Sequence, residues 1–254
     1  MREAANSRDR MRAALVIVAV IATIGFNALA AAGLVNGVTP AQISEKYPTV
    51  LTPAGYAFSI WSLIYLGITA FAVYQLLPAN LLRFRRARSV FILTCLLNCA
   101  WIYFWHRDQI AICLVLIIAL LASLIMMLVL FGRSESAVES LFTNAPFGIY
   151  AGWVTAASLV NFLIFLKYER VELSVFAWNT LGAVLIILAA VLAVIVRLKL
   201  RNYFYPLAIA WALTAIAIKQ TTNTAIVVAA AIGVVTCLIT AGTFVVNLKD
   251  STSE

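Results

Sequence analysis

An amide and two indoles share one face of a strongly apolar stretch, TCLLNCAWIYFW, which runs over residues 94–105. At about 100° per residue, Asn98, Trp101 and Trp105 fall on one helical stripe. Indole rings can stack on a flat ligand, and an amide can orient that ligand through hydrogen bonds. An amide at membrane depth also needs a partner, so the alternative interpretation is that Asn98 joins two helices while the tryptophans fill a core.

Aromatic side chains also gather in the apolar run over residues 54–77. Phe58, Trp61 and Tyr65 follow one another at intervals of three and four residues, which is typical of one helical stripe. Thr52 and the proline after it are typical of a helix start, so we expect Thr52 to be the N-cap of this run. A helix core or an interfacial aromatic belt explains any one of these rings equally well.

A third group lies in the apolar run over residues 145–166. Tyr150 and Asn161 share a stripe there, and Trp153 lies beside it. Gly152 and Ala156 form a pair of small residues four positions apart, which would let another helix backbone come close.

Composition excludes an ordinary soluble domain. The chain has 254 residues, of which 64% are hydrophobic and 11% are charged, whereas a soluble domain carries roughly a quarter charged residues. The sequence therefore predicts an all-α, polytopic membrane helix bundle. The net charge of +8 comes from basic residues in short loops, so membrane topology explains it better than a nucleic-acid partner. All four cysteines lie within apolar runs and indicate packing rather than a metal site.

Eight apolar runs are predicted to cross the membrane. The seventh is the weakest, because Lys219 limits it to fifteen residues. The first ends in a sequence similar to a signal-peptidase site, Ala28-Leu29-Ala30, but it is longer than a signal core and a retained helix is favoured. The eight runs cover residues 13–35, 54–77, 90–105, 110–131, 145–166, 176–196, 204–218 and 225–248.

The distribution of basic residues predicts the orientation of these helices. Thirteen of the 18 Lys and Arg residues fall in the two ends and in the connections after the second, fourth and sixth runs. This bias predicts a multi-pass protein of the cell membrane with both termini in the cytoplasm. The four arginines over residues 83–88 are interpreted as a cytoplasmic stop. His106, the only histidine, is interpreted as a solvated residue of a connector rather than as a proton relay.

Three stretches together resemble the tryptophan-rich sensory protein, or translocator protein (TspO/MBR, peripheral benzodiazepine receptor-like), family of five-helix membrane proteins. They are YPTVLTPAGYAFSIWSLIY over residues 47–65, LNCAW over residues 97–101, and YAGWVT over residues 150–155 with Asn161 beyond it. The chain departs from the family in its AGYAF segment, which lacks a second proline and displaces the aromatic residues by one position. That displacement turns each side chain by about 100° and puts the ligand contacts of Tyr56 and Phe58 in doubt.

The resemblance implies a five-helix core over residues 13–168. The apolar runs and basic residues outside it predict a cytoplasmic tail over residues 1–12, additional transmembrane helices over 169–248 and a tail over 249–254. The resemblance also implies a pocket between helices that binds a flat apolar ligand, of the porphyrin, haem or sterol type, with no obligatory cofactor and no metal. A sterol-recognition pattern can be traced through Leu166, Tyr168 and Arg170. The implied ligand-binding residues are Tyr56, Phe58, Trp61, Tyr65, Asn98, Trp101, Trp105, Tyr150, Trp153 and Asn161.

Three functions follow as hypotheses. The first is a ligand-binding receptor or carrier, whose partners are the bilayer and a small apolar molecule. The second is a transporter, or permease, although the core of the predicted spans lacks the charged residues that ion coupling needs. The third is an enzyme that degrades porphyrin, and the sequence offers it no nucleophile-base pair and no metal cluster. The remaining option is a purely structural subunit with a constant membrane partner. The Gly152/Ala156 pair and the family resemblance also suggest a homodimer.

Overall fold

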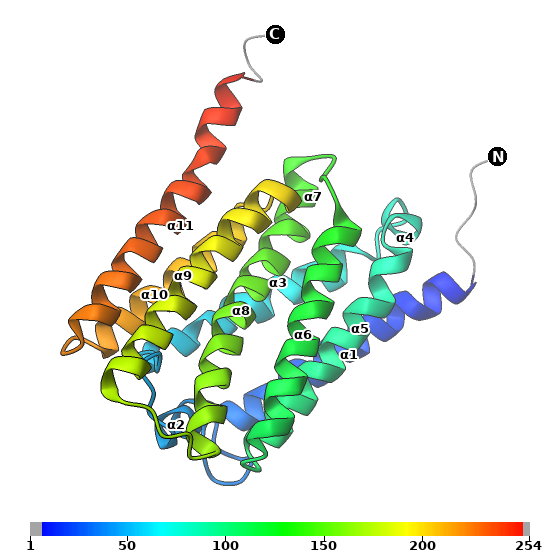
Figure 1. Ribbon diagram of the computed structural model, residues 1–254. Helices are drawn as coiled ribbons and strands as arrows, with labels where there is room; N and C mark the ends of the chain where they lie inside the picture. Colours follow the sequence, from blue (N-terminus) through cyan, green and yellow to red (C-terminus); the bar gives the residue numbers. More distant parts are fainter. Residues whose placement is uncertain (1–6, 251–254) are drawn as a thin grey trace. The chain divides into compact units, whose positions relative to one another are not determined.

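The computed structural model describes the backbone of residues 7–250 and the side chains of residues 7–243 (Figure 1). The outermost parts of the two predicted tails, residues 1–6 and 251–254, lie outside the described residues. Every regular element in the described range is a helix, which confirms the predicted all-α bundle. The elements are α1 (Ser7–Ala31), α2 (Pro40–Lys46), the 3₁₀ helix η1 (Gly55–Ser59), α3 (Ile60–Tyr74), α4 (Asn80–Arg83), α5 (Arg85–Trp105), α6 (Ile110–Phe131), α7 (Ala137–Phe142), α8 (Asn144–Tyr168), α9 (Val175–Leu200), α10 (Phe204–Lys219) and α11 (Thr224–Asp250).

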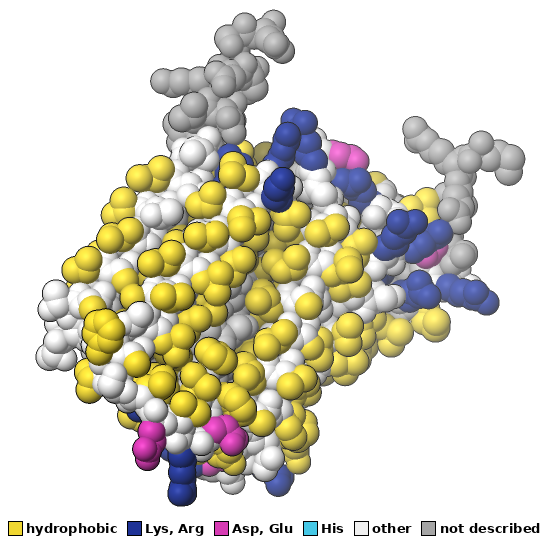
Figure 2. Space-filling model, in the orientation of Figure 1, with side chains coloured by type: hydrophobic (Ala, Val, Ile, Leu, Met, Phe, Trp, Pro, Cys, Tyr) yellow, Lys and Arg dark blue, Asp and Glu magenta, His cyan; other side chains and the backbone are white. Residues whose placement is uncertain are grey.

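Seven segments of the described chain are long and apolar enough to cross a bilayer, so the protein is an integral, multi-pass membrane protein. α6 begins and ends at the predicted residues. The shorter apolar helix α10 has 16 residues and spans about 24 Å at 1.5 Å per residue, against a hydrocarbon core of about 30 Å. Figure 2 shows apolar side chains spread over the helices of the visible face, and such a surface suits lipid rather than water.

The chain forms two compact units, and it passes between them three times. Unit 1 comprises residues 1–43 and 61–147, and unit 2 comprises residues 44–60 and 148–254. The segment 44–60 therefore belongs with the last four helices, although its neighbours in sequence belong to unit 1. The predicted division at residue 168 concerns the family resemblance rather than compactness, and it stays a prediction.

Unit 1 is built around a cluster of phenylalanine rings. Phe71 of α3 is fully buried, and its ring centroid lies 5.1–5.7 Å from four other phenylalanine rings. Edge-to-face arrangements of this kind add to the free energy gained by burying the rings. The cluster joins α3, α5, α6 and the start of α8 through Phe84, Phe91, Phe131 and Phe147.

The arginines after α3 hold unit 1 together at one end. Arg85 pairs with Asp9 of α1 at 2.7 Å, and Arg83 pairs with Glu139 of α7 at 2.8 Å. The hydrogen bond to Glu139 raises the pKa of Arg83 above its usual value. Arg88 is fully buried and donates to Gln75 Oε1 at 2.6 Å. The predicted stop segment therefore also ties α1, α5 and α7 together.

Unit 2 packs α9, α10 and α11 side by side, and α8 joins them through a close approach to α10. A Cβ atom at Gly152 would lie 2.5 Å from the carbonyl oxygen of Tyr205 and 2.9 Å from the Cβ of Ala208. Thr155 Oγ1 and the Tyr205 hydroxyl, 2.6 Å apart, form a hydrogen bond beside this contact. Gly152 thus serves helix packing within the chain, as its spacing predicted, and it gives no support to a dimer contact.

Two local predictions are wrong. Thr52 does not cap a helix, because its Oγ1 accepts a hydrogen bond from the backbone N–H of Thr49 at 2.8 Å, and the next turn is the 3₁₀ helix η1. His106 is not solvated, since only 3% of its surface is exposed and its Nδ1 lies 2.8 Å from the Ile102 carbonyl oxygen. Both residues are placed by contacts that a local pattern does not reveal.

Candidate functional site

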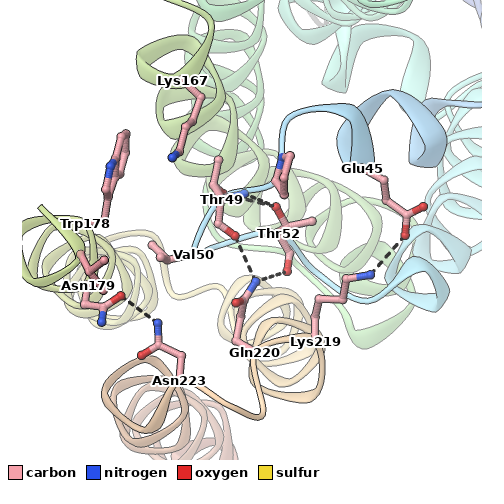
Figure 3. A pocket seen from close by; sticks show the side chains of 12 residues that line it. Glu45, Thr49, Val50, Thr52, Lys167, Trp178, Asn179, Lys219, Gln220 and Asn223 are labelled. Carbon is pink, nitrogen blue, oxygen red and sulfur yellow. Dashed lines mark hydrogen bonds and ion pairs between the residues drawn. The ribbon is translucent and has the colours of Figure 1, made fainter. Parts of the chain in front are cut away.

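The clearest candidate site is a pocket of about 680 Å³ in unit 2 (Figure 3). It lies where the segment 44–52 meets the end of α8, the start of α9 and the turn between α10 and α11. Its volume is in the range of about 300–1,000 Å³ that is typical of small-molecule sites. The lining residues are Glu45, Pro48, Thr49, Val50, Thr52, Lys167, Val175, Trp178, Asn179, Lys219, Gln220 and Asn223.

The segment 44–52 is held against α10 by an amide. Gln220 Nε2 donates to the carbonyl oxygens of Thr49 at 3.0 Å and Thr52 at 3.2 Å. The two threonine side chains meet each other at 3.4 Å between their hydroxyl oxygens, so the turn is closed on itself. In Figure 3, Gln220 points toward both threonines from the end of α10. This wall of the pocket is therefore polar and fixed in position.

Two lysines bring positive charge to the pocket. Lys219 Nζ lies 3.3 Å from a carboxylate oxygen of Glu45, and both side chains are about half exposed. Exposed pairs of this kind contribute little free energy, so an anionic ligand can replace the carboxylate. Lys167 at the end of α8 places its ammonium group 4.5 Å from the centre of the Trp178 ring. The pocket thus offers two cations that can exchange their present partners.

The remaining wall joins α9 to α11. Asn223 Nδ2 donates to Asn179 Oδ1 at 2.8 Å, and Asn223 Oδ1 accepts a hydrogen bond from the backbone N–H of Ile226 at 3.4 Å. Below them, a Cβ atom at Gly182 would lie 2.6 Å from Val50 Cγ2 and 2.8 Å from Ile226 Cδ1. The segment 44–52 therefore packs against α9 as well as α10. The pocket lining combines apolar side chains, hydroxyl groups, one indole, three amides, one carboxylate and two cations.

Five of the ten predicted ligand-binding residues lie in unit 1. Trp101 and Trp105 stack with ring centroids 5.3 Å apart, and Trp61 and Tyr65 stack at 5.5 Å. Asn98 accepts a hydrogen bond from Asn27 Nδ2 of α1 at 2.7 Å, which confirms that it joins two helices. The indole N–H of Trp105 donates to the carbonyl oxygen of Pro40 at 3.2 Å. The stripe of Asn98, Trp101 and Trp105 is therefore buried, and its side chains contact other residues of the protein.

The other five predicted residues lie in unit 2, on η1 and α8. Phe58 packs edge-to-face against Trp153, with ring centroids 5.9 Å apart. Tyr56 packs in the same way against Trp211 of α10 at 5.3 Å. Asn161 donates from Nδ2 to the Ala157 carbonyl oxygen at 2.9 Å, and Tyr150 is buried. None of the ten predicted residues lines the pocket of Figure 3, and their role in ligand binding stays a prediction.

Sequence reasoning missed the pocket residues because they belong to helix ends and connections rather than to apolar stripes. Trp178 and Asn179 lie one turn into α9, and the polar run QTTN over residues 220–223 joins α10 to α11. The available signal was that these connections share one predicted side of the membrane with the segment 44–52. That signal would have predicted a polar cluster, although not a cavity.

The described side chains include groups that can bind a ligand. Among them, no group of three or more His, Cys, Asp and Glu residues could hold a metal ion. The pocket's amides, indole and ammonium groups can recognise a ligand through stacking, hydrogen bonds and charge.

A family model described as TSPO-like protein matches residues 13–244. The match includes the five predicted core spans and continues through α9 and α10 into α11. No curated protein and no solved structure matches the chain. The matched range covers most of the 254 residues, and it agrees with the family resemblance of the three aromatic stretches. This multi-pass membrane protein therefore belongs to the TSPO-like family.

Proposed function

We propose that the protein is a membrane receptor or carrier for a flat, largely apolar ligand that bears carboxylates, of the porphyrin type. The observation that carries the proposal is the pocket of unit 2, in which Trp178, Lys167 and Lys219 are among the residues that line a volume of about 680 Å³. A tetrapyrrole macrocycle can stack on an indole. Its carboxylates can take the ammonium groups in charge-assisted hydrogen bonds.

The two lysines favour an acidic tetrapyrrole over a sterol. A sterol offers one hydroxyl group to this wall, so two ammonium groups would gain no charged partner from it. A porphyrin with two carboxylates would replace the exposed Glu45 contact of Lys219 and draw Lys167 from the Trp178 ring. The cost of releasing an exposed ion pair is small, about 0–1 kcal/mol.

The test is a titration of the detergent-purified protein with protoporphyrin IX, followed by tryptophan fluorescence. We expect saturable quenching and an affinity about tenfold lower for Lys167→Gln or Lys219→Gln, since each loses one hydrogen bond between charged groups. The uncharged dimethyl ester should bind equally to all three proteins. Arg170→Gln is the matched control, because Arg170 is exposed, follows α8 and does not line the pocket.

Absence of saturable quenching would contradict the proposal. Equal affinity of the acid and the ester for every variant would contradict the role of the two lysines. In a second experiment, Trp61→Ala and Trp153→Ala test the aromatic residues implied by the family resemblance. If these variants lose the quenching while the Lys variants keep their porphyrin affinity, the binding site lies at those rings instead. Efflux of labelled porphyrin from proteoliposomes, compared with empty vesicles, distinguishes a carrier from a receptor.

A further inference from the structure

An apolar groove of about 480 Å³ runs between α9 and α11 in unit 2. Its walls come from α9 between Ile187 and Ile195 and from α11 between Ala225 and Thr236. The single hydroxyl in this lining, on Thr236, already donates to the Ile232 carbonyl oxygen at 2.9 Å. The groove therefore offers an occupant no free polar donor along its walls and suits a hydrocarbon chain.

A buried cation lies just beyond one end of this groove. Arg197 follows Ile195 by two positions, or about 3 Å along the axis of α9, and only 6% of its surface is exposed. Among the side chains that the structure describes, its Nε has no hydrogen-bond acceptor. The guanidinium group stacks 3.8 Å from the centre of the Tyr203 ring. That contact offsets part of the cost of burying the charge, but it satisfies no N–H donor.

Two exposed cations extend this basic end. Lys199 and Arg201 lie two and four positions after Arg197 and are exposed. Three positive charges thus fall within five residues at the end of a membrane-spanning helix. Basic pockets in this position, between transmembrane helices, are typical sites for anionic lipid head groups. A phosphate group can accept two hydrogen bonds from one guanidinium group, and one of them would give Arg197 Nε an acceptor.

We propose that unit 2 binds one anionic glycerophospholipid, with an acyl chain in the groove between α9 and α11 and the phosphate at Arg197, Lys199 and Arg201. The lipid phosphate supplies the acceptor that Arg197 Nε lacks among the described residues, and the acyl chain of the same molecule covers the apolar walls. The head-group charge distinguishes this occupant from the zwitterionic lipids that surround any membrane protein. The site is separate from the ligand pocket of Figure 3, whose lining residues differ from those of the groove throughout.

The test is native mass spectrometry of the delipidated protein in a non-ionic detergent, titrated with phosphatidylglycerol or phosphatidylcholine. We expect retention of one phosphatidylglycerol at a concentration at least about fivefold below that needed for phosphatidylcholine. Lys199→Gln and Arg201→Asn should each weaken phosphatidylglycerol about fivefold. Both positions are exposed, and asparagine tolerates the left-handed backbone of Arg201 (φ 52°). Arg86→Gln, at an exposed arginine of unit 1, is the control and should change nothing.

Two further measurements distinguish the contribution of the acyl chain from that of the phosphate group. Ala229 lines the groove and is half-buried, so Ala229→Phe should fill the groove and weaken long-chain phosphatidylglycerol without affecting its dihexanoyl form. Glycerol phosphate, which has the anion and no chain, should not be retained. Equal binding of the two lipids, or unchanged binding by the Lys199 and Arg201 variants, would overturn the proposal. Retention of glycerol phosphate as tightly as the lipid would identify a site for free phosphate instead.

Discussion

Polar residues inside the apolar runs carry more structural information than the aromatic residues around them. The sequence placed Asn98 on a face that meets protein, and the structure provides Asn27 of α1 as its partner. The partner could not be predicted, because the two amides are 71 positions apart and no local pattern pairs them. Similarly, nothing near His106 in sequence indicated that its ring would be buried.

The amide pair predicts a measurable coupling between α1 and α5. We expect Asn27→Leu and Asn98→Leu each to destabilise the protein, and the double variant to lose about 0.6 kcal/mol less than the sum of the two, because one interhelical hydrogen bond is removed only once. Thermal unfolding in detergent measures all four proteins. Strict additivity would show that the contact at 2.7 Å contributes no stability.

Phe71 predicts the largest single loss in unit 1. Truncation of Phe71 to alanine removes a fully buried ring that touches four others, so we expect a loss of about 3–5 kcal/mol. Leu66→Ala in the same helix is the control, since 68% of Leu66 is exposed. The same unfolding measurement tests both, and equal effects would contradict the central position of Phe71.

At the scale of elements, the apolar runs predicted the long helices well, because a span of about 20 residues is a strong signal. The predicted helix start at Thr52 is wrong because the conformation of this segment depends on a distant helix. That helix is α10, where Trp211 Nε1 donates to the Ala57 carbonyl oxygen at 3.0 Å and the Ala54 N–H donates to the Ala215 carbonyl oxygen at 3.0 Å. These contacts join residues more than 150 positions apart.

The packing of α8 on α10 predicts opposite effects for two similar substitutions. Gly152→Ala should destabilise the protein by about 1–3 kcal/mol, because the new Cβ would lie 2.5 Å from a backbone oxygen that cannot move freely. Gly25→Ala, in α1, should be neutral or stabilising by up to about 1 kcal/mol, because its Cβ would meet nothing within 4 Å. Melting temperatures of the two variants provide the comparison, and a fall for both would contradict it.

At the scale of the whole molecule, composition alone predicted the membrane class. The division into two units was not predicted, since it depends on which helices the segment 44–60 joins. The pocket of Figure 3 was not predicted either. It is formed by helix ends and connections whose meeting depends on the packing of α8 to α11.

Orientation can be tested on intact cells with a membrane-impermeant maleimide. We expect Glu172→Cys and Thr222→Cys to be labelled from outside and Ser7→Cys only after permeabilisation, because the basic residues favour cytoplasmic termini. All three positions are exposed. Labelling of Thr222→Cys from the side opposite to Glu172→Cys would contradict a crossing by α10, and reversal of all three would invert the topology.

The segment 44–60 also sets a condition on how the protein is made. Its hydrogen bonds to Ala215, Trp211 and Gln220 link it to a helix that the ribosome completes more than 150 residues later. During synthesis, these hydrogen bonds therefore cannot form until residues 211–220 have been made. A nascent chain arrested after α8 should be cleaved within residues 44–60 by added protease, and one arrested after α11 should resist it.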